Sequence, residues 1–483
     1  MKVSLLINDQ DVAAANGATF ERLNPISGAI ASTAAAAGAH DATAAADAAA
    51  AAFPAWSALG PNERRARLNR AADLLQSRAK EFVTIMTAEI GAASAWAQFN
   101  VRLATQMLRE AAAMTTQICG EVMPSERTQR LAMSIRQPAG VAVGIAPWNA
   151  PIILAVRAIA MPLACGNTVI LKASELCPGT HRMIGDVMRD AGLGAGVVNV
   201  VTNAPDDAPI VVQTLIEHPA VRRINFTGST RVGKIVAEIA ARQLKPVLLE
   251  LGGKAPMIVL EDADLDEAVA AAAFSAFMNQ GQICMSTERL VVQDTVADAF
   301  VAKLATKAAS LKVGDPTIEP DVAIGSMIGI APITRAQQLL EDATKKGARI
   351  VTGNEVNGTI MRPTVIDFVT PEMKIYHEET FAPVVCIVRV KDVEEAIQVG
   401  NDTEYGLAGA VFTRDMAVAM DVARRLQSGS CHINGPTVQD EAHMPFGGMK
   451  ASGYGRFGGH AAIHEFTDLR WITMETGPVH YPI

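Results

Sequence analysis

The 483-residue sequence has little of several features that mark particular classes of protein. Its six cysteines are scattered, with no C-x-x-C pair and no cysteine–histidine spacing typical of zinc ligands. We therefore predict neither a disulfide framework nor a metal site. No apolar run reaches the ~18 residues of a membrane span, and the N-terminal run is too short for a signal peptide. These absences favour a cytoplasmic protein that does not insert into a membrane.

The sequence also lacks the basic surface that nucleic-acid binding requires. Lys and Arg number 42 against 50 Asp and Glu, the formal charge is −8, and no stretch clusters basic residues. Because contacts to phosphates need clustered positive charge, a nucleic-acid partner is excluded. Hydrophobic residues make up 49% of the chain, which is typical of a well-buried globular protein. One core rarely grows beyond roughly 250–300 residues, so the length predicts two large domains.

The first part of the chain has mainly helical patterns. The Ala-rich region 31–55 is predicted to be one helix, because Ala is the best helix former. Further helices are predicted over 64–80, 82–90 and 101–114, with Trp96 and Phe99 between the last two.

Residues 118–137 alternate instead, which favours a β-hairpin. Such a ribbon is not stable alone. The C-terminal stretch 466–475 also has a strand pattern, and we expect it to pair with the hairpin in a small sheet that projects to a neighbouring subunit.

The middle of the chain alternates short apolar runs with helical patterns. This βαβ rhythm predicts an α/β fold with a doubly wound parallel sheet, whose ligands bind beyond the carboxyl ends of the strands. After residue 284 a second alternation predicts a second α/β domain. Strands are expected at 141–146, 168–172, 197–201, 223–226 and 247–251, then at 289–293, 349–352 and 384–390.

Three polar stretches lie at the predicted strand ends. Asn149, on a turn restrained by two prolines, is placed to donate its amide to a developing oxyanion, although a turn or helix-capping role is the ordinary alternative. Lys172 and Glu175 suit the hydroxyl groups of a ribose, although such residues are often just solvated. The third, Gly228 to Lys234, is similar to a P-loop, but Ile235 stands where that motif needs Ser or Thr. A glycine turn that opens a helix can still bind a pyrophosphate.

Two further residues point to covalent catalysis. Cys284 follows a helical run and a glycine, which suits a nucleophilic thiol, whereas a buried structural cysteine is the alternative. Glu250 interrupts an apolar strand, so burial should raise its pKa towards the range of a general base. Its alternative is a structural ion pair, for which Lys254 is the one nearby cation.

Together these residues resemble the aldehyde dehydrogenase family over nearly the whole chain. The motifs that carry the resemblance occur in the order of that family: Pro147-Trp148-Asn149, Lys172 with Glu175, Phe226-Thr227-Gly228-Ser229, Glu250-Leu251-Gly252-Gly253, Gly281-Gln282-Ile283-Cys284, Glu378 to Pro383, and Pro445 to Gly453.

The resemblance implies a role for each catalytic residue. Cys284 would attack the aldehyde, Asn149 would stabilise the oxyanion, and Glu250 would activate the water that hydrolyses the thioester. A non-catalytic member of the family and a CoA-acylating member, which is expected to lack the glutamate, are the alternatives. The presence of Cys284, Glu250 and Asn149 together does not favour either. The implied cofactor is NAD rather than NADP, because Glu175 would repel a 2′-phosphate. The implied cofactor-binding residues are Ile145, Pro147, Trp148, Lys172, Ser174, Glu175, Gly228, Ser229, Val232, Leu251, Gly252, Glu379 and Phe381.

The resemblance is strongest to the branch that oxidises aromatic aldehydes such as salicylaldehyde and vanillin. Ala173, Ala150 and Arg157 depart from the wider family and agree with this branch. Arg157 would donate to a ring hydroxyl, unless it forms a structural ion pair. A semialdehyde dehydrogenase for aliphatic substrates is the alternative, but it would need cationic residues before Pro445, where the sequence has the acidic stretch Gln439-Asp440-Glu441. The expected substrate residues are Trp96, Phe99, Ala150, Arg157, Phe274, Ile283, Met285 and Phe446.

The resemblance also implies an arrangement of domains and subunits. Residues 1–117 and 138–249 would form the NAD-binding domain, and 250–440 the catalytic domain. Residues 118–137 and 463–483 would form the oligomerisation sheet of a homodimer or homotetramer, and 441–462 would link the active site to both domains.

Overall fold

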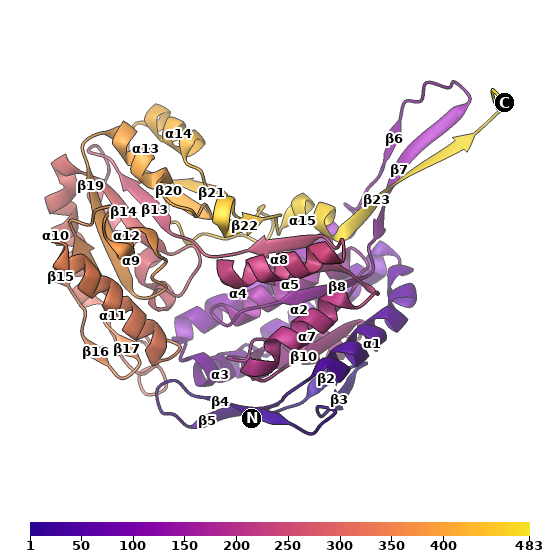
Figure 1. Cartoon of the computed structure of the whole chain (residues 1–483), viewed down its shortest axis with the longest axis horizontal. Helices are drawn as coiled ribbons and strands as arrows, with labels where there is room; N and C mark the ends of the chain where they lie inside the picture. The colour runs from indigo at the N-terminus through magenta and orange to yellow at the C-terminus, as the bar shows by residue number, and fades with distance from the viewer.

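Two large sheets form the main parts of the structure, and a small sheet projects from them (Figure 1). The structure is a computed structural model that describes residues 1–483. The large sheets are mostly parallel and the projecting one is antiparallel, which confirms the predicted fold class. No helix combines the length and the apolar character needed to cross a membrane.

The first large sheet has eight strands in the order β22-β12-β11-β8-β9-β10-β2-β3. Its five central strands are parallel and lie within two residues of the predicted ranges. Short antiparallel strands complete both edges. The strands are β8 (Val141–Ile145), β9 (Thr168–Lys172), β10 (Val198–Val201), β11 (Val221–Thr227) and β12 (Val247–Glu250), with β2 (Leu5–Ile7), β3 (Gln10–Val12) and β22 (Gly453–Tyr454) at the edges.

Helices cover both faces of this sheet, so its central strands are buried on both sides. In β9, Val169 and Leu171 pack into one core while Ile170 packs into the other. This alternation is the two-residue period of a strand. One face carries α1 (Ala39–Ser57), α7 (Ala208–Glu217) and α8 (Thr230–Arg242). The other carries α4 (Ser94–Met114), α5 (Pro151–Ala164) and α6 (Pro178–Asp190), with α2 (Pro61–Ser77) and α3 (Ala79–Ile90) outside them.

Strand order reverses between β8 and β11. From β8 the chain moves through β9 to β10 on one side, whereas β11 and β12 lie on the other side. At such a switch point the connections leave in opposite directions and open a crevice beyond the carboxyl ends of the strands. The segments that carry Asn149, Glu175 and Ser229 begin at this edge, and Glu250 is the last residue of β12 there.

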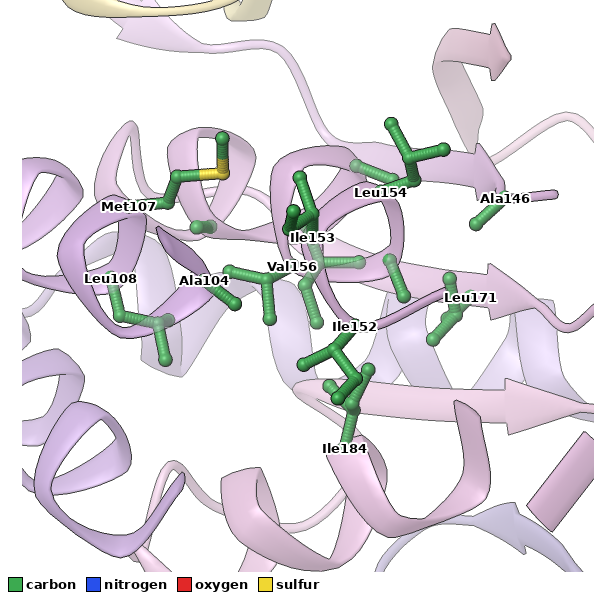
Figure 2. Close-up of a cluster of buried hydrophobic side chains, with 14 of the residues drawn as sticks. Ala104, Met107, Leu108, Ala146, Ile152, Ile153, Leu154, Val156, Leu171 and Ile184 are labelled. Carbon is green, nitrogen blue, oxygen red and sulfur yellow. The ribbon is translucent and has the colours of Figure 1, made fainter. Parts of the chain in front are cut away.

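Helix α5 is the most deeply buried helix beside this crevice. It begins with Pro151, whose fixed φ suits a first helical position. Figure 2 shows Ile152, Ile153, Leu154 and Val156 packed between Met107 and Leu108 of α4 and Leu171 of β9. Arg157 is the one charged residue of α5, and it too is buried.

The second large sheet has seven strands in the order β15-β18-β19-β14-β13-β20-β21. The predicted strands β14 (Thr287–Gln293), β15 (Arg349–Thr352) and β19 (Val384–Val390) are confirmed. Four strands were not predicted: β13 (Ala255–Val259), β18 (Thr364–Asp367), β20 (Ala408–Phe412) and β21 (Ser430–Ile433). The surrounding helices are α9 (Leu265–Phe277), α10 (Asp294–Ser310), α11 (Ile330–Lys345), α12 (Lys374–His377), α13 (Val393–Asn401) and α14 (Met416–Arg425).

The projecting sheet consists of β6 (Glu121–Met123), β7 (Arg130–Pro138) and β23 (Thr467–Glu475), with the C-terminus near its tip (Figure 1). Strands β7 and β23 pair along their whole length, from Thr467 opposite Pro138 to Glu475 opposite Arg130. The predicted pairing of the hairpin with the C-terminal strand is therefore confirmed. Helix α15 (Gly459–Phe466) leads into β23.

Two sequence predictions are wrong in the N-terminal part. The region 31–55 is not one helix, because residues Ile30–Ala35 form β5, which pairs with β1 (Lys2–Val3) on one side and β4 (Thr19–Leu23) on the other. Hydrogen bonds to two neighbouring strands outweigh the helix propensity of Ala here. Trp96 and Phe99 do not lie between helices, because α4 already begins at Ser94.

Candidate active site

Cys284 lies on a tight turn that follows α9, as the sequence predicted. The turn from Met278 to Gly281 contains Asn279 and Gln280 in left-handed conformation, with φ of 49° and 58°. Non-glycine residues keep such angles only when their surroundings hold them. The Asn279 amide donates to the Asn149 carbonyl oxygen at 2.9 Å, and the Gln280 amide donates to the Ser326 carbonyl oxygen at 2.8 Å. These bonds fix the turn that presents the thiol.

Gly253 allows the end of β12 to approach this turn. A Cβ atom at Gly253 would lie 2.3 Å from the Cys284 carbonyl oxygen, so no other residue fits there without backbone movement. The close approach places Glu250 and Cys284 in one site although 34 residues separate them in sequence (284 − 250).

The Asn149 side chain is held in one orientation beside Cys284. Its Nδ2 group donates to the Gln282 carbonyl oxygen at 2.9 Å, and the Trp96 indole donates to the Asn149 carbonyl oxygen at 3.0 Å. The residue that caps α5 is Ala150, without a side-chain cap, so Asn149 does not serve as a helix cap. An amide nitrogen has two hydrogens, and the second remains free to donate into the pocket that Asn149 shares with Cys284.

Glu250 is fully buried at the end of β12, and neither of its oxygens has a hydrogen-bond partner. Burial raises the pKa of its carboxyl to about 7, while the neighbouring Cys284 and Arg157 lower it in part. Lys254 does not pair with Glu250, because its ammonium group binds the Glu288 carboxylate at 2.6 Å. The structural ion pair considered for Glu250 is thus absent.

Burial and the charge of Glu250 raise the pKa of the Cys284 thiol well above its usual value. The resting thiol is therefore protonated at neutral pH. A carboxylate with a pKa near 7 stands next to it and can accept its proton.

A mainly apolar pocket with an empty volume of about 810 Å³, including its open mouth, leads to Cys284 and Asn149. All eight substrate residues expected from the sequence line it: Trp96, Phe99, Ala150, Arg157, Phe274, Ile283, Met285 and Phe446. The rings of Trp96 and Phe99 stack with centroids 5.5 Å apart. The pocket thus offers flat aromatic walls to a ligand.

Seven further lining residues were missed in the sequence. Three of them follow helical spacing that could have revealed them: Leu103 lies four residues after Phe99, and Ile153 and Leu154 lie three and four residues after Ala150. The remainder come from loops for which no sequence pattern was available. The missed residues are Leu103, Ile153, Leu154, Met278, Val438, Gln439 and Asp440.

Arg157 is held by Asp440 and by two aromatic rings. Its guanidinium forms an ion pair with the Asp440 carboxylate, and both side chains are almost fully buried. The guanidinium carbon lies 4.2 Å from the Phe446 ring centroid and 5.9 Å from that of Phe457. The ion pair that the sequence left open is therefore present, and Arg157 also remains part of the pocket wall.

A second group of predicted residues lies at the ends of β9 and β10. The Lys172 ammonium binds the Glu175 carboxylate, which also accepts a hydrogen bond from the Asn203 amide at 3.0 Å. The other polar atom of that amide, Asn203 Oδ1, is buried and has no partner. Asn203 was missed in the sequence. The hydroxyl of Ser174 already accepts from the Leu176 N–H at 3.2 Å.

Helix α8 begins at the end of β11, directly after Gly228. The Ser229 hydroxyl caps it and accepts from the Val232 N–H at 3.4 Å. The other N–H groups of a first helical turn have no partner within the helix, and the helix dipole adds a partial positive charge. This end of α8 can thus bind an anion.

The second large sheet contributes Glu379 and Phe381 to the same crevice. The Gly253 N–H donates to Glu379 Oε1 at 2.9 Å, and a Cβ on Gly252 would lie 3.0 Å from Glu379 Oε2. The Phe381 ring meets the Trp148 ring edge-on with centroids 6.0 Å apart. The loop that carries these residues therefore closes over the ends of β8 and β12, where Ile145, Pro147 and Leu251 lie.

This donor set fits a dinucleotide. A helix N-terminus provides amide donors for a pyrophosphate, and the carboxylates of Glu175 and Glu379 provide acceptors for ribose hydroxyls. The unpartnered Asn203 Oδ1 beside Glu175 is a further buried acceptor that a bound hydroxyl or amino group would satisfy.

Comparison with known proteins agrees with this arrangement. Residues 12–472 match the profile described as "Aldehyde dehydrogenase family". A vanillin dehydrogenase of Pseudomonas fluorescens is 59% identical over the full length of both chains. A benzaldehyde dehydrogenase [NAD(+)] of Pseudomonas putida is 39% identical, covering 97% of this chain and 96% of the relative. The crystal structure of a salicylaldehyde dehydrogenase from Pseudomonas putida G7, complexed with salicylaldehyde, superimposes with a TM-score of 0.99 at 47% identity over the whole of both chains.

Proposed function

The chain belongs to the aldehyde dehydrogenase family and is thus an NAD(P)-dependent oxidoreductase, and from this premise we propose that it oxidises an aromatic aldehyde to the carboxylate with NAD as cofactor. The substrates we propose are of the vanillin and salicylaldehyde type, as in two of its relatives. The observation that carries this proposal is the pocket with aromatic walls, including Trp96 and Phe99, that ends at Cys284 and Asn149.

In the first step Cys284 attacks the aldehyde carbon. Its thiol proton passes to the Glu250 carboxylate, the sulfur–carbon bond forms, and the carbonyl π electrons move to the oxygen. Asn149 Nδ2 donates to this oxyanion with the hydrogen that Gln282 does not use. Because Gln282 already holds the amide, its orientation costs no reorganisation as the charge develops.

Oxidation then converts the thiohemiacetal to a thioester. Glu379, held by the Gly253 N–H, and Phe381, which lies against Trp148, would hold the nicotinamide of a bound cofactor. In its oxidised form that ring would supply the acceptor for the former aldehyde hydrogen, transferred as hydride.

Glu250 completes the cycle by hydrolysis. Once it has lost the thiol proton to solvent, its carboxylate accepts a proton from a water molecule as that water attacks the thioester carbon. The carbon–sulfur bond then breaks, the carboxylic acid leaves, and Cys284 regains a proton. A pKa of about 7 suits this role, because the base is ionised in part at neutral pH and still holds a proton strongly enough to remove one from water.

We propose NAD rather than NADP because of the charge at the adenosine end. Glu175 is held at the end of β9 by Lys172 and Asn203, so its carboxylate would oppose a 2′-phosphate and accept from a free 2′-hydroxyl. The Lys172 ammonium is bound to the Glu175 carboxylate and is therefore not free to bind a 2′-phosphate.

A semialdehyde dehydrogenase with an aliphatic substrate remains the second candidate. A terminal carboxylate on the substrate would need a cation in the pocket. Arg157 is the one cation among the lining residues, and Asp440 already neutralises it. The pocket therefore favours an uncharged ring.

The test is the rate of NADH formation by the purified protein with benzaldehyde, salicylaldehyde, vanillin and succinic semialdehyde, each with NAD and with NADP. We expect the three aromatic aldehydes to have the higher kcat/KM values, with NAD preferred. A higher kcat/KM for succinic semialdehyde would favour the second candidate.

We also propose that the protein is a homodimer or homotetramer assembled through the projecting sheet. Leu469, Trp471 and Met474 on β23 are 61%, 68% and 55% exposed, which is unusual for large apolar side chains. Leu469 and Trp471 share one face of β23 and Met474 lies on the other, and packing of this strand against another subunit would remove such side chains from water.

A further inference from the structure

The loop that carries Asp440 is fixed at both ends against the catalytic turn and the pocket wall. At its start, the Thr437 hydroxyl donates to the Met285 carbonyl oxygen at 2.7 Å, one residue beyond Cys284. At its end, Phe446 exchanges two backbone hydrogen bonds with Phe457, at 2.9 and 2.8 Å. Asp440 thus stands at a defined place in the pocket that Cys284 and Asn149 close.

The Asp440 carboxylate has acceptor positions to spare. An ionised carboxylate offers about four such positions. The Arg157 guanidinium takes one of its two oxygens, and the Glu441 N–H is the other donor near it. These two donors leave acceptor positions of the carboxylate unfilled, and Asp440 lines the pocket together with Arg157. A ligand in the pocket can therefore donate a hydrogen bond to it.

The remaining wall offers few other acceptors away from the reacting carbon. Among the other lining residues, Val438, Ile153, Leu154 and Phe446 have no polar side-chain atoms, and Gln439 offers only the uncharged oxygen of its amide. Arg157 can only donate, and the Asp440 carboxylate and the Phe446 ring already engage its guanidinium. Asp440 is thus the charged acceptor to which a hydroxyl group on a bound aromatic ring could donate.

We propose that Asp440 is a specificity-determining residue that accepts a hydrogen bond from the hydroxyl group of a hydroxylated aromatic aldehyde, with Arg157 holding its carboxylate in place. This inference rests on the proposed aromatic substrate. It differs from recognition by Arg157, because a carboxylate selects a hydrogen-bond donor on the ring, whereas a guanidinium selects an acceptor. Methoxy and hydroxy groups at one ring position distinguish the two, since only the hydroxy group donates.

The experiment measures kcat and KM for benzaldehyde and for the 2-, 3- and 4-hydroxybenzaldehydes, each against the methoxybenzaldehyde with the same ring position. In the wild-type protein we expect a hydroxy-over-methoxy preference in kcat/KM at one or more positions. In Asp440→Asn the amide oxygen can keep Arg157 while its NH₂ group, a donor, faces the ring. The preference should then fall by about tenfold or more, mainly through KM, as for a lost hydrogen bond to a charged group.

Two further variants keep the test decisive. Glu441→Gln removes a charge from the exposed neighbour on the same loop and should leave the preference unchanged. The double variant Arg157→Met with Asp440→Leu replaces the buried pair by apolar groups, which avoids an unpaired charge should Asp440→Asn fail to fold. It too should lose the preference while it still oxidises benzaldehyde.

Specific outcomes would overturn the inference. One is a wild-type protein with no hydroxy-over-methoxy preference at any position. Another is an equal fall in kcat/KM for the hydroxy and the methoxy substrates in the Asp440 variants. This result would mean that the Arg157–Asp440 pair only positions the loop. Failure of the proposed function is distinguishable, because then neither benzaldehyde nor its derivatives would be oxidised by the wild-type protein.

Discussion

Replacement of Glu250 by Gln tests both the chemistry and the electrostatics of the site. The substitution keeps the size of the side chain and removes its ability to accept a proton at neutral pH. Hydride transfer precedes hydrolysis, so we expect a burst of about one equivalent of NADH per active site. Turnover should then slow by about 10²- to 10⁴-fold, the range typical of a lost general base.

The pKa of about 7 sets the pH dependence of the wild-type protein. The ionised fraction of Glu250 is about one tenth at pH 6 and about nine tenths at pH 8. Where hydrolysis limits the rate, kcat should therefore rise about tenfold across this interval. In Glu250→Gln the slow phase should lack this rise, which separates the titration of Glu250 from that of other groups.

The same shift predicts a gain in stability for the variant. Below the ordinary pKa of 4.5 Glu250 is protonated in both states, so burial costs no charge. As the pH rises from 4.5 to about 7, the unfolded state loses this proton while the folded state keeps it, so the folded state becomes progressively less stable, and above about 7 the loss is complete. A pKa raised from 4.5 to about 7 corresponds to a loss of about 3 kcal/mol of stability at pH 8.

Rapid-mixing measurements of NADH and thermal unfolding of the apoprotein check these expectations. Unfolding of Glu250→Gln should occur at a higher temperature than that of the wild type at pH 8, with a difference that shrinks towards pH 5. Glu341→Gln, at an exposed position, serves as the matched control and should change neither property. A normal steady state in Glu250→Gln, or a difference in unfolding that is independent of pH, would refute the reasoning.

Four other substitutions or deletions give distinct outcomes. Cys284→Ser should abolish oxidation without loss of NAD binding by calorimetry, because a hydroxyl is far less acidic than a thiol; substantial remaining turnover would exclude Cys284 as the nucleophile. Glu175→Ala should narrow the ratio of kcat/KM for NAD over NADP, and a wild-type preference for NADP would contradict its proposed role. Arg157→Ala leaves Asp440 buried and unpaired, so unfolding by denaturant should show a loss of about 3–5 kcal/mol, and an unchanged midpoint would mean that the pair is not essential to stability. Deletion of the chain after Ala462 removes β23, and sedimentation should then show monomers or insoluble protein; an intact oligomer would place the subunit contact elsewhere.

The sequence revealed those parts of the fold where local pattern and final structure agree. The parallel strands β8 to β12 appeared as short apolar runs because helices bury both of their faces, and polar residues at their ends were visible as interruptions. Residues Ile30–Ala35 were misassigned because Ala favours helices locally, whereas pairing with β1 and β4 is decided by contacts far along the chain.

In the active site too, contacts between segments far apart in the sequence could not be predicted. The residues Cys284, Glu250 and Asn149 stand in recognisable local contexts, and the aromatic walls could be predicted with them. The partners of those residues could not. Asp440 is 283 residues away from Arg157 in sequence, so the ion pair between them was not readable from either stretch alone. Asn203 likewise meets Glu175 only because β9 and β10 are neighbours in the sheet.

The turn with the left-handed residues Asn279 and Gln280 is the part of the active site that we expect to fail first during prolonged use. Each such residue costs of order 1–3 kcal/mol and is kept in place by hydrogen bonds to separate segments, among them the loop of Asn149 and the Ser326 backbone. If warming loosens one of these segments, the turn can relax while both sheets stay folded, since parts of a protein open independently. The operational lifetime of the catalyst would then be shorter than its melting temperature implies, and efforts to prolong it should reinforce these few hydrogen bonds rather than the core.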